Sequence, residues 1–224
     1  MVRTAKDNGV LKRFEFLEGR YLIPNDGTQF FTSDTIHCKH CCTREHREGN
    51  ITYHHNALGI VMVHPDEQQV IPLLPPEFIC KQDGQTKNDC ELNASKRLTQ
   101  DIKQAYPDFK FIIVEDALYA NAPHIEHLES LDMKYIIVAK ESDHEYLFNA
   151  VKVTRKYEKK HRTIIKDGVT HYFEFTNDVP LNKTHPDVRV NFLYYRQTDK
   201  KGKTTIWTWI TNIPITMQNV YHIM

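Results

Sequence analysis

The stretch Phe111 to Ala120, FIIVEDALYA, decides the fold that we predict for this chain. It begins with an apolar run that shows no alternation and is too short for a helix, which predicts a strand buried on both faces. Two carboxylates, Glu115 and Asp116, end the run. Because ligands bind beyond the carboxyl ends of such strands, Asp116 is a candidate metal ligand. The alternative interpretation is that Asp116 only caps the turn that follows.

Length and composition exclude several classes of protein. The 224 residues fit one domain, or one domain with an insertion, and 29 basic residues balance 29 acidic ones. That balance gives no global attraction to nucleic acid or membrane. The N-terminus lacks the apolar core of a signal peptide, and no apolar run approaches the roughly 20 residues that span a bilayer. Five cysteines, three of them within residues 38–42, do not form a disulfide pattern, so we expect a reduced, cytoplasmic protein.

Extended segments and helices follow one another in a definite order. Three extended segments separated by turns predict an antiparallel meander, and three helices then alternate with two short buried strands. The expected strands and helices are 21–31, 53–63 and 70–74, then helix 89–106, strand 111–115, helix 121–131, strand 135–139 and helix 142–150, and finally strands 169–175, 188–195 and 204–213. Asn88 and Glu91 fit a capping box for the first helix. Asp26-Gly27 marks either a hairpin turn or a point where another group approaches the strand.

This order predicts an α/β fold of the ribonuclease-H-like type, with a mixed sheet made by an antiparallel meander and then βαβα. A β-rich insertion follows at the C-terminal end. The expected division is an N-terminal lead-in (1–17), a ribonuclease-H-like catalytic core (18–150) and a β-rich insertion region (151–224). In such a sheet the first and fourth strands are neighbours, so Asp26 and Asp116 would face each other.

Paired carboxylates on neighbouring strands suit Mg²⁺ or Mn²⁺, which prefer oxygen ligands. Two such ions about 4 Å apart can activate an attacking oxygen and stabilise the leaving oxygen of a phosphodiester. Asp26 and Asp116 are therefore the candidate catalytic and metal-binding residues. By strand alternation, Glu115 points to the opposite face from Asp116.

Four segments in this order resemble bacterial DDE transposases of the insertion-sequence-4 type: Asn25–Phe31 with Ile36–Cys38, Lys87–Ala94, Val114–Tyr119 and Trp207–Asn212. The resemblance runs from about residue 11 to the end of the chain. It implies that Asp26 and Asp116 are two members of a metal-binding triad in a ribonuclease-H-like core. It also implies metal-dependent DNA strand cleavage and transfer, with transposon ends and target DNA as partners of a homodimer.

The third carboxylate of the family is a Glu on a helix after the β insertion, and the sequence reaches Met224 before any such helix. We therefore expect a core fragment that is inactive alone. Glu91, Glu115 and Glu141 are poor substitutes by position. Two further functions stay open: a non-catalytic DNA-binding remnant of a transposase, and a ribonuclease-H-like nuclease with a third acid of its own.

The pair Cys38 and Cys41 has the Cys-x-x-Cys spacing of half a tetrahedral zinc site. Candidates to complete it are His37, His40, His46, His54, His55, Cys80 and Cys90. Because no second Cys-x-x-Cys is present, the sequence favours a loop of reduced thiols over a zinc site.

Residues 152–166 carry seven basic side chains and a single acid, Glu158. Such a run is either a solvated hairpin or, in a DNA-handling protein, a source of phosphate contacts. The candidate DNA-binding residues are Lys152, Arg155, Lys156, Lys159, Lys160 and Arg162. Trp207 and Trp209 share one face of their strand, and we expect them in the core rather than stacked on bases.

Overall fold

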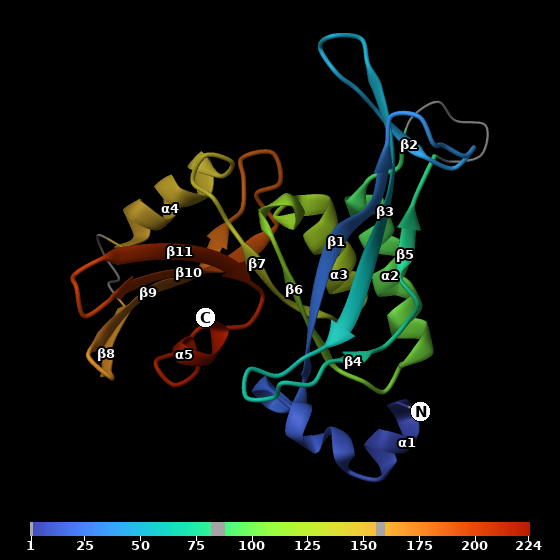
Figure 1. Cartoon of the computed structure of the whole chain (residues 1–224). Coiled ribbons are helices and arrows are strands. Elements are labelled where there is room, and N and C mark those ends of the chain that lie inside the picture. Colours follow the sequence, from blue (N-terminus) through green and yellow to red (C-terminus); the bar gives the residue numbers. More distant parts are fainter. Residues whose placement is uncertain (1, 82–87, 156–159) are drawn as a thin grey trace. The chain divides into compact units, whose positions relative to one another are not determined.

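The computed structural model describes residues 2–81, 88–155 and 160–224 (Figure 1). The chain forms two compact units, residues 1–110 and 111–224. Both combine helices with β-sheet, and the second has a mixed sheet, which confirms the predicted α/β class. The finer division at residues 17 and 150 stays a prediction. Among the described residues, no helix is long and apolar enough to cross a membrane.

The first unit is organised around strand β3 (Ile51–Met62). β3 pairs antiparallel with the four other strands that the structure describes in this unit. These are β1 (Tyr21–Ser33), β2 (Cys42–Glu45), β4 (Ile71–Pro72) and β5 (Glu77–Ile79), accompanied by helices α1 (Val2–Asp7) and α2 (Glu91–Ala105). The predicted antiparallel pairing is confirmed, whereas β2 and β5 are strands that the sequence did not indicate.

Strand β1 runs through Asp26-Gly27 without turning, so the hairpin interpretation is wrong. The alternative is confirmed, because a Cβ atom at Gly27 would lie 2.6 Å from Oε1 of Glu91 on α2. Asn25 is buried and its Nδ2 donates to Ser95 Oγ at 2.7 Å. Gly27 therefore leaves room for the Glu91 carboxylate, which would have to move if residue 27 carried a Cβ atom.

Helix α2 begins without the predicted capping box. Its N-cap residue is Cys90, whose side chain makes no capping hydrogen bond. The side chain of Asn88 instead exchanges two hydrogen bonds with the backbone of Thr43 on β2, at 3.0 and 2.7 Å. The Asn88 side chain thus bonds to Thr43 as the backbone of a paired strand would, and it cannot cap α2 at the same time.

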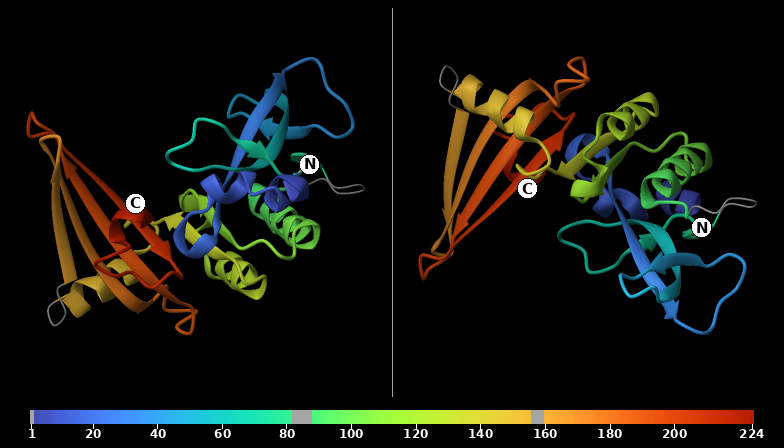
Figure 2. Two further views of the ribbon diagram at one scale, coloured as in Figure 1. Left: turned by 90° about the horizontal axis from the view of Figure 1, so that it is seen from below. Right: turned by 90° about the horizontal axis from the view of Figure 1, so that it is seen from above.

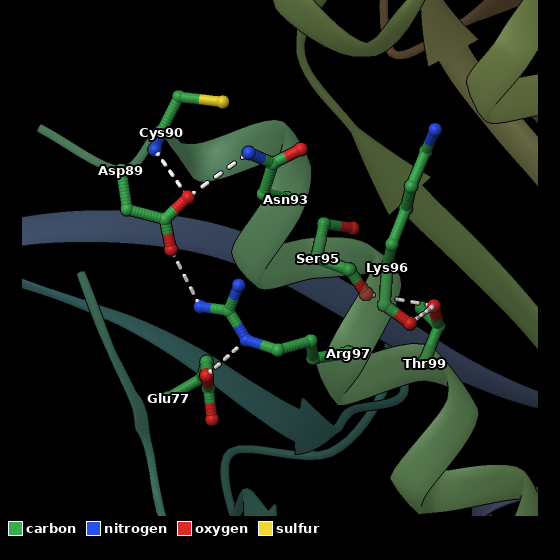
Figure 3. A network of polar contacts seen from close by, with 8 residues as sticks. All are labelled: Glu77, Asp89, Cys90, Asn93, Ser95, Lys96, Arg97 and Thr99. Carbon is green, nitrogen blue, oxygen red and sulfur yellow. Dashed lines mark hydrogen bonds and ion pairs between the residues drawn. The ribbon is translucent and has the colours of Figure 1, made fainter. Parts of the chain in front are cut away.

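An ion-pair network fixes the start of α2 (Figure 3). Arg97 Nη2 donates to Asp89 Oδ2 at 2.7 Å, and Arg97 Nε donates to Glu77 Oε1 at 2.5 Å. Burial alone would raise the pKa of Asp89, but hydrogen bonds from Arg97, from the Asn93 amide and from the Cys90 N–H outweigh it and lower the pKa. The network joins α2 to β5 and to the segment that precedes the helix.

The second unit contains one sheet with the strand order β6-β7-β11-β10-β9-β8. β6 and β7 are parallel, and the remaining neighbours are antiparallel. The elements are β6 (Phe111–Glu115), α3 (Ala122–Ser130), β7 (Lys134–Val138), α4 (Glu145–Arg155), β8 (Lys160–Lys166), β9 (Val169–Pro180), β10 (Arg189–Thr198), β11 (Thr204–Thr211) and α5 (Val220–Ile223). Phe111, Ile112 and Ile113 are almost completely buried, which confirms the expected buried strand.

The β-rich region continues the same sheet, because β11 pairs with β7 through Trp209 opposite Val138. Asp167-Gly168 forms the hairpin turn between β8 and β9, with φ of 53° and 76° as a primed turn requires. Helices α4 and α5 cover opposite faces of β9 and β10 (Figure 2). The Phe148 ring of α4 packs on Phe192, and the Tyr221 ring of α5 packs on Phe173.

Candidate functional site

Asp116 directly follows strand β6 and its side chain is exposed. Its Oδ1 accepts a hydrogen bond of 2.9 Å from the Leu118 N–H and so caps the 3-10 helix Ala117–Tyr119. The interpretation of Asp116 as a turn cap is therefore correct, although the sequence argument favoured a metal ligand instead. The two roles are compatible, because an exposed carboxylate has two oxygens and the cap uses one of them.

Glu115 is buried and Asp116 is exposed, which agrees with the opposite faces that strand alternation predicted. Its Oε2 lies 2.7 Å from Nε2 of His124 on α3, and neither side chain has any exposed surface. The Tyr119 ring packs against His124, with 5.2 Å between the ring centroids. This buried pair joins β6 to α3 one residue before Asp116, so it limits the freedom of the backbone that carries the Asp116 carboxylate.

Asp26 lies in the first unit, on β1, with its side chain exposed. Gly27, the next residue, faces the Glu91 carboxylate, so strand alternation turns the Asp26 side chain toward the other face of β1. Asp116 belongs to the second unit. That the two aspartates bind one metal centre stays a prediction.

The three glutamates considered as a third acid have other partners. Glu91 faces Gly27, Glu115 pairs with His124, and Glu141 Oε1 accepts a hydrogen bond of 2.7 Å from Lys152 Nζ. Of these, Glu115 is fully buried and is unavailable to solvent or substrate.

Cys38, Cys41 and His55 form a compact cluster in the first unit. The Cys41 N–H donates to the Cys38 carbonyl at 3.2 Å, closing a turn that puts the two sulfurs 3.8 Å apart. His55 Nε2, on β3, lies 3.5 Å from Cys38 Sγ and 3.2 Å from Cys41 Sγ. A hydrogen bond from the His40 N–H, together with contacts from Cys41 and Lys39, lowers the pKa of the Cys38 thiol. The sequence named His55 only as one of seven candidates, because residue spacing does not reveal strand register.

The cluster borders two cavities of about 420 Å³ each. Phe30, Phe31, Ile36 and His37 line the first cavity together with the three cluster residues. Phe30, His40, His55, Phe78 and Cys80 line the second. Three of these apolar side chains are exposed by more than half, namely Phe30 at 56%, Ile36 at 69% and Phe78 at 57%.

The predicted DNA-binding residues are only partly described. Lys152 is exposed on α4 and bound to Glu141, whereas Lys156 and Lys159 lie outside the described residues. Arg155 ends α4, but its side chain also lies outside them. Lys160 and Arg162 lie on β8, the last strand of its sheet, and Arg162 donates to the Met217 carbonyl. DNA contact by this region stays a prediction.

Trp207 and Trp209 share one face of β11, as predicted, and both stack on Tyr195, with ring centroids 5.4 and 6.2 Å apart. Trp207 nevertheless keeps 38% of its surface exposed, and Trp209 is half-buried. The expectation that both lie in the core is wrong for Trp207, which lies in the exposed part of β11, residues 204–207.

Comparisons with known proteins give little further information. No protein-family model matches the chain. No curated protein matches it. Among solved structures it is similar to a piggyBac transposase in a synaptic complex with hairpin DNA, at 11% identity and a TM-score of 0.38. The match covers 97% of this chain and 39% of that transposase, so the chain spans well under half of its length. A likeness of this size supports no statement about activity.

Proposed function

We propose that this chain belongs to the catalytic core of a bacterial DDE transposase of the insertion-sequence-4 type, with a ribonuclease-H-like arrangement. Four sequence segments in the family's order support the proposal. The structural observation that carries it is the position of Asp116, an exposed carboxylate just beyond the buried strand β6. Carboxyl ends of such strands are where α/β folds bind ligands.

In this proposal Asp26 and Asp116 are the metal ligands. Both are exposed carboxylates, and carboxylate oxygens are the donors that Mg²⁺ and Mn²⁺ prefer. When bound, these ions lower the pKa of the attacking water or 3′-hydroxyl and stabilise the leaving oxygen. Glu115 and His124 act as positioning residues, because their buried contact holds the end of β6 against α3. Basic side chains of α4 and β8 would contact DNA phosphates.

A second candidate function is a DNA-binding protein without strand-transfer activity. This function is favoured because Glu91, Glu115 and Glu141 each lie against another residue, so none of these glutamates is a readily available third carboxylate. A nuclease that uses one of these glutamates would have to break the contact first. Metal-dependent cleavage of DNA by this chain alone would contradict both candidates and favour such a nuclease, because the transposase core fragment is also expected to be inactive alone.

The metal site is tested by titrating Mn²⁺ into ¹⁵N-labelled protein and recording paramagnetic broadening of amide signals. We expect broadening at both Gly27 and Ala117, lost at both positions in Asp26→Asn and in Asp116→Asn. Asparagine is chosen at 116 because its Oδ1 can still accept the Leu118 hydrogen bond that the wild-type carboxylate accepts. Broadening at one position that survives substitution at the other would show two independent weak sites and refute a shared centre.

DNA binding is tested by the salt dependence of affinity for a short duplex. Each phosphate contact that is lost reduces the slope of log K against log salt by about 0.9. We expect the pair of changes Lys160→Glu and Arg162→Glu to weaken binding and flatten this slope. The matched control reverses Lys200 and Lys201, which are exposed in the turn after β10. Equal effects in both variants would remove β8 from the interface.

A further inference from the structure

We propose that Cys38, Cys41 and His55 bind one Zn²⁺ ion, with a solvent molecule as the fourth ligand. The proposal is independent of the transposition chemistry, because it involves different residues and a softer set of donors. Thiolate and imidazole ligands select zinc, whereas carboxylates select magnesium. The three donor atoms all lie within 4.8 Å of one another.

The distances within the cluster match a tetrahedral zinc ion. With Zn–S near 2.3 Å and Zn–N near 2.05 Å, ideal tetrahedral angles put the two sulfurs about 3.8 Å apart and each sulfur about 3.6 Å from the nitrogen. The structure has 3.8 Å between the sulfurs, and 3.5 and 3.2 Å from Nε2 of His55 to the sulfurs of Cys38 and Cys41. A disulfide would need the sulfurs at about 2.05 Å, whereas the separation of 3.8 Å is compatible with two thiolates around one tetrahedral ion.

Local structure holds these donors in place without the ion. The turn from Cys38 to Cys41 is closed by a backbone hydrogen bond, and the Cys38 N–H donates to Cys41 Sγ at 3.3 Å. Such backbone bonds to a ligating sulfur orient it toward a metal. His55 is fixed by its strand, since β3 pairs with both β1 and β2. The rings of Phe30 and Phe31 pack on the imidazole.

The fourth position is assigned to solvent because, among the described residues, no other donor joins the group of three. His37 lines the same cavity, but its ring stacks on Tyr53 at 4.3 Å and its Nδ1 contacts the Thr35 carbonyl. Three protein ligands and one exchangeable position are the arrangement of an open zinc site. Here that position adjoins a cavity with exposed aromatic walls, and the ion would tie the loop after β1 to β3.

The test is metal analysis of full-length protein prepared in reductant without chelator. We expect one zinc per chain and, after exchange, a cobalt form with the sulfur-to-metal charge-transfer and intense visible bands of tetrahedral thiolate coordination. X-ray absorption should give two sulfurs, one imidazole nitrogen and one further light atom. The cobalt spectrum should be lost in Cys38→Ser, Cys41→Ser and His55→Gln.

Three control variants should keep the zinc: Cys90→Ser and His46→Gln, whose wild-type side chains are exposed outside the cluster, and His37→Asn. Loss of metal in His37→Asn would overturn the proposed ligand set. The proposal also fails if wild-type protein binds no stoichiometric zinc while its thiols stay reduced, or if it contains a Cys38–Cys41 disulfide. X-ray absorption on wild-type protein keeps the test valid even where a variant does not fold.

Discussion

Removing the carboxylate of Glu115 should destabilise the second unit strongly, although Glu115 is no candidate metal ligand. Its contact with His124 is 2.7 Å long and both side chains are completely buried. Glu115→Ala leaves the buried imidazole without this partner. Breaking one side of a buried pair costs about 3–5 kcal/mol when both groups are charged, and about 1–3 kcal/mol when the group left behind is neutral. The two ranges meet at about 3 kcal/mol, which we take as the expected loss.

For a chain of this length, about 3 kcal/mol corresponds to a fall in Tm of roughly 6–12 °C. Urea and thermal unfolding, followed by the fluorescence of Trp207 and Trp209 in the same unit, measure both quantities. Glu115→Gln keeps an acceptor oxygen and should lose less than half as much. Glu126→Ala, at an exposed position of α3, is the control and should change little.

A double-mutant cycle decides whether the contact itself is responsible. Changing both Glu115 and His124 to Leu replaces the buried pair by apolar groups, which is often close to neutral. We therefore expect the double variant to be more stable than either single variant of the cycle, Glu115→Leu or His124→Leu. A Glu115→Ala variant that loses less than about 1 kcal/mol, or a double variant whose loss equals the sum of the singles, would refute this reasoning.

Three further predictions use the same unfolding measurements. Asp116→Ala should lose about 1 kcal/mol of stability, the usual cost of removing a helix cap, while Asp116→Asn should lose only a few tenths of a kcal/mol. Equal losses in the two variants would contradict the capping role. The lowered pKa of Asp89 contributes stability that is present above the ordinary aspartate pKa near 3.9 and is lost as pH falls through the lowered value. Asp89→Asn should therefore weaken the fall in unfolding free energy at acid pH. An unchanged fall would argue against the Arg97 pair. Gly27→Ala should cost about 0.5–1.5 kcal/mol, because the Glu91 side chain has to rotate away from the new Cβ atom, and adding Glu91→Ala should recover most of that loss; no recovery would locate the strain elsewhere.

Segments governed by local chemistry were predictable from the residues alone. The run at 111–115 became the buried strand β6, and the Asp167-Gly168 turn joins β8 to β9. Asn121 caps α3 through a hydrogen bond from the His124 N–H, near the predicted start of that helix. In each case the signal and the structure lie within a few residues of each other, so chain neighbours alone decide the outcome.

Predictions failed where a side chain had a choice of partners. Asn88 could cap α2 or bind β2, and it binds β2 because Thr43 offers both a donor and an acceptor. Glu91 could belong to the same capping box, but it lies over Gly27. For Asp116 the local partner, the Leu118 N–H, is confirmed, and the metal ligand role stays a prediction because the cap uses only one carboxylate oxygen.

Apolar runs, turn residues and alternation in the amino-acid sequence were enough to predict the α/β class, the buried strand and the opposite directions of Glu115 and Asp116. They could not predict that Glu115 contacts His124 or that His55, out of seven candidates, joins Cys38 and Cys41. Those contacts depend on how β6 packs on α3 and on the register of β3 against its neighbours. A pattern along the chain records which side chains are buried, but the partner of a buried or ligating group is set by packing between segments that are distant in sequence.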